Sequence, residues 1–222
     1  MTAEPGALVE KTIPGLHEAV VEILRARLGR KPARIADLGA GSGAWAARLL
    51  SEGHLVYAVE RDRAFFELRT LQPIVADLDQ PFAHLVPNGL DAVTAIEVIE
   101  HLENPRHFLR ECRKLLAPDG LLLLTTPNVE CVPGRLRFLA SGQLRHFDRD
   151  PSFNDPTHIT PIQSYLFERM ASDCGFRIEH HGFNRPTPTI GKGLVRLVSA
   201  LLSPLLRGIT GGDNHVFVLR PL

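Results

Sequence analysis

Residues 37–43 read DLGAGSG and separate two segments of different periodicity. The apolar stretch 34–38 before them predicts a strand, and residues 44–51 after them predict a helix. Glycines at such a junction let the backbone turn tightly and approach a ligand closely. Glu60 ends the next predicted strand about 20 residues later, the usual place for a carboxylate that binds ribose hydroxyls. The stretch therefore predicts a parallel α/β sheet with a cofactor at its carboxyl edge.

Strand and helix patterns alternate on both sides of this loop. The predicted strands are 34–38, 54–59, 73–76, 90–96, 121–126, 176–180 and 215–219. The predicted helices are 12–28, 44–51, 61–71, 105–116 and 161–174. Such alternation is typical of a doubly wound sheet with helices on both faces.

Two stretches interrupt this alternation. Residues 127–160 hold several Pro, Gly, Asn and Asp residues without a long period, and they predict a small lid insertion. Residues 190–209 form an apolar segment that Pro204 divides. We expect a single domain over 1–222, with an N-terminal helical cap over 1–30.

The composition excludes several classes of protein. The 222 residues include 25 Lys and Arg against 25 Asp and Glu, so no basic excess points to nucleic acid. Cys112, Cys131 and Cys174 are far apart and form no C-x-x-C, which favours a reducing compartment over a disulfide framework. The N-terminal stretch has no apolar core of a signal peptide, and no stretch is long enough to span a bilayer. We expect a cytoplasmic protein.

Two cofactors compete for the glycine loop. A dinucleotide prefers G-x-G-x-x-G and a helix N-terminus open to its pyrophosphate, whereas here the third glycine comes one residue earlier. The Asp37 carboxylate would repel a pyrophosphate but attract the ammonium of an amino-acid tail. S-adenosylmethionine has that ammonium and no phosphate, so it is favoured over NAD. The minority alternative is that Asp37 only caps the turn.

Several stretches then resemble the class I S-adenosylmethionine-dependent methyltransferases. They are IADLGAGSG (35–43), VE (59–60), VADL (75–78), LDAVTAIEVIEHLENP (90–105) and LLAPDGLLLLTTPN (115–128). The resemblance is close over 34–127 and looser through HITPIQSYLFERMASDCGFRIE (158–179) to the final strand. It implies a seven-stranded sheet, mostly parallel, with an antiparallel last strand.

The same resemblance implies roles for residues of the glycine loop and the second strand. Asp37 and Gly39 would bind the methionine tail, and Gly41 would let the cofactor lie against the backbone. Glu60 would bind both ribose hydroxyls.

Roles for residues of later strands are implied in the same way. Asp77 would bind the adenine amino group, with Leu78 packed on the ring, although Asp77 as a helix N-cap or turn residue remains an alternative. Glu97 would lie at the mouth of the site.

Glu97, Glu100 and His101 follow the fourth predicted strand at spacing i, i+3, i+4, which places them on one side of a helical turn. Three interpretations stay open. His101, with Glu100, acts as a general base on a substrate hydroxyl; or Glu97, Glu100 and His101 bind a divalent metal; or Glu100 and His101 only support the loop. E-x-x-E-H followed by T-P-N resembles the small-RNA 2′-O-methyltransferases and the ubiquinone-pathway O-methyltransferases, both metal-dependent. In the RNA enzymes a lid histidine completes the metal site, and His158 matches it. Metal binding is the less favoured interpretation.

The predicted lid and the apolar segment bear on the acceptor. Basic and aromatic residues gather in the lid: Arg135, Arg137, Arg145, His146, Arg149, Phe138 and Phe147. They predict either recognition of an anionic substrate or a solvated helix face. For residues 190–209 core or interface packing is favoured, with an oligomer surface, a pocket wall and peripheral membrane contact as alternatives.

We expect transfer of a methyl group to an oxygen of a small-molecule, sugar or lipid-linked acceptor. The rivals are a non-catalytic cofactor-binding partner subunit and an NAD-dependent oxidoreductase.

Overall fold

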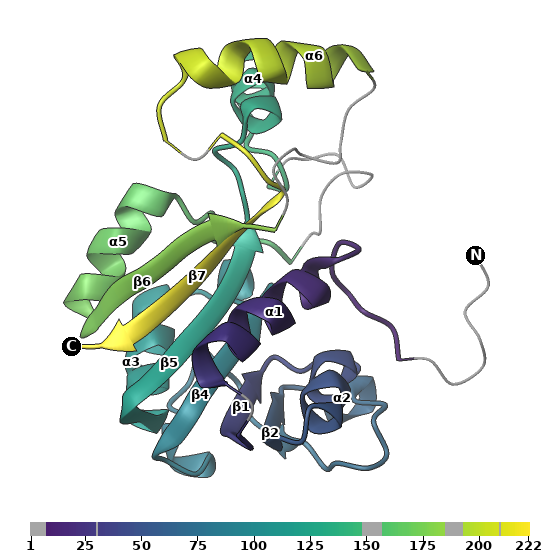
Figure 1. Ribbon diagram of the computed structural model, residues 1–222, viewed down its shortest axis with the longest axis vertical. Coiled ribbons are helices and arrows are strands. Elements are labelled where there is room, and N and C mark those ends of the chain that lie inside the picture. Colours follow the sequence, from purple (N-terminus) through teal and green to yellow (C-terminus); the bar gives the residue numbers. More distant parts are fainter. Residues whose placement is uncertain (1–7, 30, 148–156, 185–192, 209) are drawn as a thin grey trace.

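The computed structural model describes residues 8–29, 31–147, 157–184, 193–208 and 210–222. Seven strands form one sheet in the order β3-β2-β1-β4-β5-β7-β6 (Figure 1). The strands are β1 (Arg34–Leu38), β2 (Leu55–Glu60), β3 (Ile74–Val75), β4 (Leu90–Ile96), β5 (Leu116–Pro127), β6 (Phe176–Phe183) and β7 (Asn214–Pro221).

The pairing of the strands confirms the predicted sheet. β1 pairs in parallel with β2 and β4, and β4 pairs in parallel with β5. The last strand, β7, is antiparallel to both β5 and β6. β2 and β4 lie on opposite sides of β1, so the chain order of the strands reverses direction at β1. This switch point is where open α/β sheets bind ligands.

Helices cover both faces of the sheet. The α-helices are α1 (Leu16–Leu28), α2 (Ala44–Ser51), α3 (Pro105–Leu115), α4 (Val132–Ser141), α5 (Ser164–Asp173) and α6 (Gly193–Leu202). Short 3-10 turns are η1 (Arg63–Phe65), η2 (Ala83–Leu85), η3 (Ile99–His101) and η4 (Ser203–Leu205).

Two hydrophobic clusters follow from the alternation of side chains along the strands. In β5, Leu121 and Leu123 pack in the cluster of α1 and α2, whereas Leu122 and Leu124 pack in that of α3 and α5. All four side chains are buried. A strand that is buried on both faces needs apolar residues at consecutive positions, which explains the four consecutive leucines of β5.

The predicted helix 61–71 is wrong. Only η1 forms there, and the Asp62 carboxylate accepts a hydrogen bond from the Ala64 amide at its start. Further along, the Glu67 amide donates to the Ser42 carbonyl of the glycine loop at 3.0 Å. The backbone of this segment therefore bonds to the loop instead of to itself.

The lid insertion contains a helix that the sequence did not reveal, α4. Gly134 lies inside it, and a Cβ there would come within 2.6 Å of the Val129 carbonyl oxygen. The glycine that weakened the helical pattern is thus required by close packing.

The apolar segment 190–209 forms α6 and η4, and the helix ends at Leu202, before Pro204. Core packing is wrong for its described side chains, because none between 197 and 208 is buried. α6 contacts α4, and the two project together beyond the carboxyl end of β5 (Figure 1). Among the described residues, no helix has the length and apolarity needed to cross a bilayer. Residues 1–7 and 30 of the predicted cap, 148–156 of the lid, and 190–192 and 209 of this segment lie outside the described residues.

Candidate active site

A cleft of about 840 Å³ opens at the carboxyl ends of β1, β2 and β4. The glycine loop forms its floor, the N-terminal segment forms one wall, and residues after β4, β5 and the lid form the other. Of the predicted site residues, those that line it are Asp37, Gly39, Gly41, Glu60, Glu97, His101 and His158. The switch point of the sheet and the predicted site therefore coincide.

Asp37 is a buried carboxyl group on this floor. Its side chain is 2% exposed, and Oδ2 has no hydrogen-bond partner among the described residues. Its pKa is raised to about 7, mainly by burial and also by the nearby Glu60 carboxylate, against the opposing effect of a hydrogen bond from the Ala46 amide. A buried oxygen without a donor, facing a cleft, fits an ammonium group. S-adenosylmethionine carries such a group.

Two glycines of the loop, Gly39 and Gly41, have different structural roles. Gly39 has φ 71°, and a Cβ there would come 2.6 Å from Val98 Cγ2. Gly41 has φ 53°, and a Cβ there would meet nothing within 4 Å, because the position faces the open cleft. Gly39 therefore serves close packing of the protein itself, whereas Gly41 leaves its backbone accessible to a bound molecule.

Glu60 anchors the same loop from the end of β2. Its Oε2 accepts a hydrogen bond from the Gly41 amide at 2.7 Å, and its Oε1 accepts one from the Asp62 amide at 3.2 Å. Each carboxylate oxygen retains a lone pair for a further donor. Glu60 thus fits two hydroxyl groups without leaving the loop.

The predicted N-terminal cap borders the site, as expected, mainly through the segment before α1. The cap helix was expected from residue 12, but Pro14 and Gly15 precede its start at Leu16. The extended segment 8–15 lies across the cleft, where the Ser42 hydroxyl donates to the Val9 carbonyl at 2.7 Å. Lys11 Nζ lies 4.7 Å from the centroid of the Phe65 ring. The cap was expected to be helical, whereas the residues that line the cleft lie mostly before the helix.

Asp77 and Leu78 do not line the cleft. Asp77 is exposed, and its Oδ1 accepts a hydrogen bond from the Asp79 amide at 3.0 Å, which is the turn role considered for it. Leu78 is buried among the core residues. Their roles toward adenine stay predictions.

Glu97 has a left-handed backbone, with φ 55°. The Thr125 hydroxyl accepts from the Glu97 amide at 3.0 Å and donates to Glu97 Oε1 at 2.9 Å. Asn214 Nδ2 donates to Oε2 at 2.5 Å. Burial raises the pKa of Glu97 to about 7, although both hydrogen bonds lower it. Thr125 and Asn214 were not identified as partners of Glu97 from the sequence alone. Thr125 lies in the quoted TTPN motif, whereas no motif surrounds Asn214.

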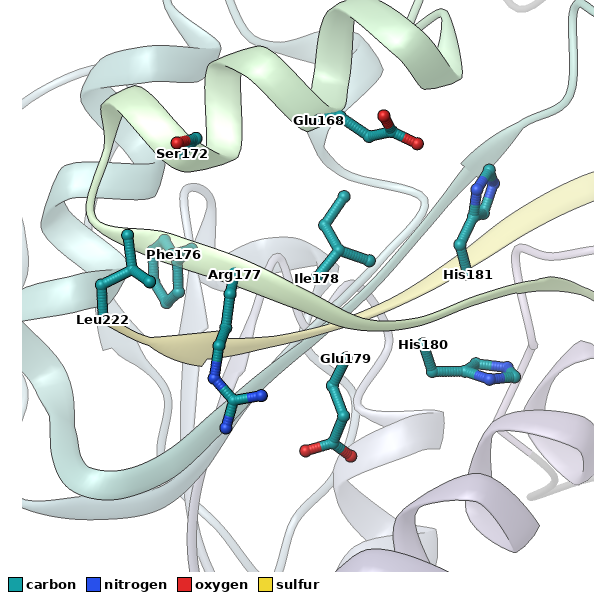
Figure 2. A pocket seen from close by; sticks show the side chains of 9 residues that line it. All are labelled: Glu168, Ser172, Phe176, Arg177, Ile178, Glu179, His180, His181 and Leu222. Atoms are coloured by element: carbon teal, nitrogen blue, oxygen red, sulfur yellow. The ribbon is translucent and has the colours of Figure 1, made fainter.

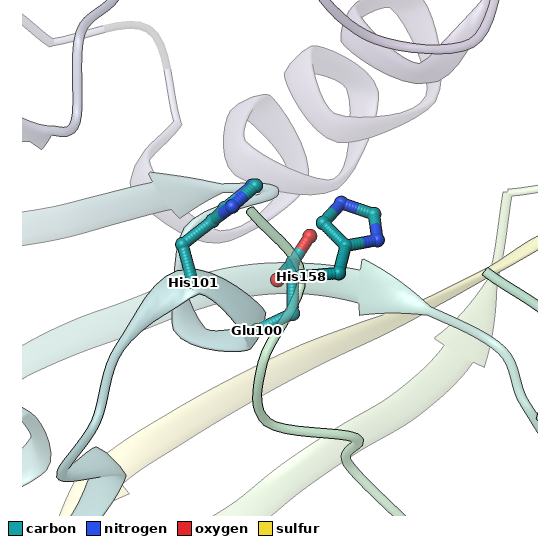
Figure 3. Close-up of side chains that lie close together, drawn as sticks. All are labelled: Glu100, His101 and His158. Carbon is teal, nitrogen blue, oxygen red and sulfur yellow. The ribbon is translucent and has the colours of Figure 1, made fainter. Parts of the chain in front are cut away.

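Glu100, His101 and His158 converge beside the cleft (Figure 3). One donor atom from each lies within 4.8 Å of the other two. The two imidazole rings are 4.7 Å apart and edge-on. Glu100 has no exposed surface. The structure therefore brings together three of the four predicted metal ligands, and Glu97 lies outside that group.

Backbone carbonyls determine which ring nitrogen of each neutral imidazole carries the hydrogen. His101 Nδ1 lies 3.2 Å from the Thr157 carbonyl oxygen and 2.8 Å from its hydroxyl, and His158 Nδ1 lies 3.1 Å from the His146 carbonyl oxygen. Because a carbonyl only accepts, each neutral ring carries its proton on Nδ1. Nε2 is then the basic nitrogen, the atom that takes a proton or binds a metal.

The segment that carries His158 is bound to η3 through its backbone. The Ile159 and Thr160 amides both donate to the Glu100 carbonyl at 2.9 Å. The Thr160 hydroxyl donates to the Leu102 carbonyl at 2.5 Å. These bonds fix the lid residue beside the predicted base.

Two arginines of the predicted basic patch of the lid make their hydrogen bonds within the protein. Arg145 is buried, and it donates to Asp213 Oδ1 at 2.9 Å and to Cys131 Sγ at 3.1 Å. Arg135 donates to backbone carbonyls of Glu130 and Arg207. Arg145 is thus neither a substrate ligand nor part of a solvated face. Arg149 lies outside the described residues.

A second hollow, of about 480 Å³, lies at the opposite edge of the sheet between α5 and β6 (Figure 2). Glu168 and Ser172 of α5 and residues of β6 such as His181 line it. It contains no residue of the predicted site.

Comparison with known proteins agrees with this geometry. The family model described as a methyltransferase domain matches residues 15–181. A protein named "Probable S-adenosylmethionine-dependent methyltransferase" from Mycobacterium tuberculosis is 33% identical over 150 residues, which are 60% of this chain and 54% of that protein. A ubiquinone biosynthesis O-methyltransferase of Xanthomonas campestris pv. campestris is 27% identical over 127 residues, 54% of this chain and 53% of that protein. The chain spans about half the length of the curated relatives it matches.

Solved structures share the fold. A S-adenosylmethionine-dependent methyltransferase from Archaeoglobus fulgidus superposes with a TM-score of 0.65 at 18% identity, over 92% of this chain and 94% of that one. At this identity the likeness concerns the fold alone. The family model, by contrast, covers most of the chain, including the glycine loop and the cluster after β4. The chain belongs to the class I family of S-adenosylmethionine-dependent methyltransferases.

Proposed function

We propose that the protein binds S-adenosylmethionine in the 840 Å³ cleft and directs its methyl group to an oxygen of a small-molecule acceptor. One observation carries the proposal. The buried, partnerless Oδ2 of Asp37 and the imidazole of His101 line the same cleft. When bound, the cofactor supplies an electrophilic methyl group on a sulfonium sulfur.

The residues of the floor hold the cofactor. Asp37 binds the ammonium of the methionine tail, Gly41 offers open backbone, and Glu60 accepts from the ribose hydroxyls. Holding two reactants in one geometry supplies a large part of the rate in such a transfer. We also propose that Asp77 and Leu78 contact the adenine. Neither residue lines the cleft, so this contact requires the adenine to extend beyond it.

His101 acts on the acceptor. Its Nε2 takes the proton of the acceptor hydroxyl as that oxygen bonds to the methyl carbon and the carbon–sulfur bond breaks, so the methylated acceptor and the thioether that leaves are both uncharged at these atoms. Thr157 holds Nδ1 and so fixes the tautomer. Glu100, buried beside the ring, stabilises the imidazolium that results.

Oxygen is favoured over nitrogen as the acceptor atom. A neutral amine already has a lone pair, whereas a hydroxyl gains nucleophilicity when a base removes its proton. The relative from Xanthomonas campestris is named an O-methyltransferase. A sugar or lipid-linked hydroxyl remains within this proposal.

A divalent metal is the alternative use of the same side chains. Glu100, His101 and His158 present a carboxylate and two imidazoles, donors that suit Zn²⁺, Mn²⁺ or Fe²⁺. Both Nδ1 atoms are held by backbone carbonyls, as in many metal sites. In this version the three side chains would hold the ion, His101 would be a ligand instead of a base, and the bound metal would supply a lowered pKa for the acceptor hydroxyl.

The test is calorimetric titration of S-adenosylmethionine into chelator-treated protein, repeated with Mn²⁺, followed by incubation of labelled cofactor with a small-molecule extract. We expect saturable binding without metal, and label in products that His101→Gln abolishes while cofactor affinity is unchanged. Activity that requires Mn²⁺ and is lost in His158→Gln would select the metal mechanism. Cofactor binding without any labelled product would support a non-catalytic partner subunit, and no binding would refute the proposal.

A further inference from the structure

His17 is a buried imidazole to which the proposed function gives no role. It lies in the first turn of α1 (Leu16–Leu28), lines the cleft and is only 3% exposed. Its ring packs 5.2 Å from that of Trp45, at the start of α2. Its Nδ1 is buried and makes no hydrogen bond to any residue that the structure describes. Because burying a polar atom without a partner is costly, this atom on the wall of the cleft indicates a partner on the ligand.

A carboxylate of the protein itself lies beside this imidazole. Glu10 Oε1 is 3.2 Å from His17 Nδ1, and the Glu10 side chain, which also lines the cleft, is 36% exposed. Burial lowers the pKa of His17, although the Glu10 carboxylate raises it, so the ring is neutral at pH 7 and carries one hydrogen. This corner of the cleft therefore accommodates a carboxylate. The one that occupies it belongs to a surface side chain, which can leave at little cost.

His17 and Asp37 flank the same turn of α2 (Ala44–Ser51). Trp45, against which His17 packs, is the neighbour of Ala46, whose amide donates to the Asp37 carboxylate. Both His17 and Asp37 also line the cleft. In an amino acid the ammonium and the carboxylate are attached to one carbon atom, so the residues that bind them must lie close together. Since Asp37 fits the ammonium, a donor for the carboxylate is needed on this flank, and the His17 ring provides one.

We infer that His17 binds the carboxylate of the cofactor's amino-acid tail, and that Glu10 occupies this position in the free protein as an internal competitor. The inference rests on the proposed binding of S-adenosylmethionine in the cleft. As the cofactor enters, Glu10 turns into solvent and His17 Nδ1 donates to the incoming carboxylate, while Asp37 binds the ammonium. Glu10 therefore lowers the affinity only for ligands that carry this carboxylate. Selectivity for the intact amino-acid tail then lies in α1 and the segment before it, outside the glycine loop.

The experiment is calorimetric titration of the full chain with S-adenosylmethionine and with decarboxylated S-adenosylmethionine, which keeps the sulfonium and the ammonium but lacks the carboxylate. His17→Phe preserves an aromatic ring against Trp45 and should lower the affinity for the intact cofactor roughly tenfold, through loss of a hydrogen bond to a charged group. Its affinity for the decarboxylated compound should equal that of the parent protein. His17→Gln keeps an N–H donor and should recover part of the loss.

Glu10→Ala should act in the opposite direction. It removes the internal competitor and should raise the affinity for the intact cofactor about threefold, with no gain for the decarboxylated compound. Loss of an anion would by itself weaken the binding of a cofactor with a net positive charge, so a gain is specific to competition. The matched control is Glu103→Ala, which replaces an exposed glutamate that does not line the cleft. It should bind both ligands like the parent protein.

Three results would overturn the inference while the parent protein still binds the cofactor, which leaves the proposed function intact. The first is an equal loss of affinity for both ligands in His17→Phe, since the ring would then only support the shape of the cleft. The second is unchanged affinity of His17→Phe for the intact cofactor. The third is unchanged or lower affinity of Glu10→Ala for it. A parent protein that binds neither ligand would refute the proposed function and this inference together.

Discussion

The Glu60 carboxylate accepts a hydrogen bond from the Gly41 amide at 2.7 Å, across the floor of the cleft. The bond ties the end of β2 to the loop after β1, the two elements that the cofactor must contact together. It also holds the Glu60 carboxylate close enough to Asp37 to raise the pKa of Asp37. A single carboxylate, that of Glu60, therefore both holds the loop in place and influences the charge of Asp37.

Replacing Glu60 separates its two roles. Glu60→Ala removes the acceptor for Gly41 and the acceptors for the ribose, and it should weaken S-adenosylmethionine binding by about 2–4 kcal/mol, since hydrogen bonds to charged groups are among the strong ones. Glu60→Gln keeps one carbonyl acceptor and should lose roughly half of that. Calorimetric titration measures both. Equal affinity of Glu60→Ala and the parent protein would contradict a ribose role.

Gly41 and Gly142 form a matched pair of glycines. Both have positive φ, 53° and 69°, and a Cβ on either would meet nothing within 4 Å. Each change to alanine should therefore lower the free energy of unfolding by a similar amount, about 1–2 kcal/mol, from left-handed strain alone. Of the two, only Gly41→Ala should weaken cofactor binding, because Gly41 lines the cleft and Gly142 does not. Parallel denaturant unfolding and calorimetry test this, and an equal loss of affinity in Gly142→Ala would refute it.

Asp37 should lower the stability of the cofactor-free protein at neutral pH. Its folded pKa, about 7, lies above its ordinary value of 3.8, so its favourable contribution is complete below pH 3.8 and is lost as the pH rises to about 7. Asp37→Asn cannot ionise, so it should gain stability relative to the parent protein between these pH values, by about 2–4 kcal/mol at pH 8. Urea unfolding at pH 5 and pH 8 measures the difference. A difference independent of pH would contradict the raised pKa.

The same carboxyl group should couple cofactor binding to proton release. The ammonium of S-adenosylmethionine favours the ionised form of Asp37, so binding at pH 6 should expel a proton that the free protein holds. Calorimetry in two buffers of different ionisation enthalpy detects this release, and Asp37→Asn should abolish it. Identical heats in both buffers for the parent protein would argue against Asp37 as the ammonium ligand.

The buried pair Arg145–Asp213 should matter for folding more than for cofactor binding. Arg145→Met removes the guanidinium that pairs with the buried Asp213 carboxylate and should cost about 3–5 kcal/mol of unfolding free energy. Arg145→Met/Asp213→Asn removes both charges and should recover part of that loss. Denaturant unfolding of the two variants gives the comparison. Equal instability of the single and double variants would show that the Asp213 charge is not the cause.

The sequence by itself determined the architecture and the place of the site. Continuous apolar runs such as Leu121–Leu124, separated by helical periods, specify a sheet covered on both faces, because burial depends on local alternation. The loop from Asp37 to Gly43 and the acidic end of β2 specified where a cofactor would lie. Each of these signals is contained within a few neighbouring residues, so it can be recognised without knowledge of the rest of the chain.

Only the tertiary structure decided the contacts that complete the site. Asn214 lies 117 residues from Glu97 and Thr157 lies 56 from His101, and each pair meets because of the strand order or the lid path, which no local pattern encodes. The segment after β2 failed to form the predicted helix for the same reason, since Glu67 bonds to Ser42 of a distant loop. Local propensity describes what a segment does alone, whereas the free energy gained by packing against remote partners determines what it does in the folded chain.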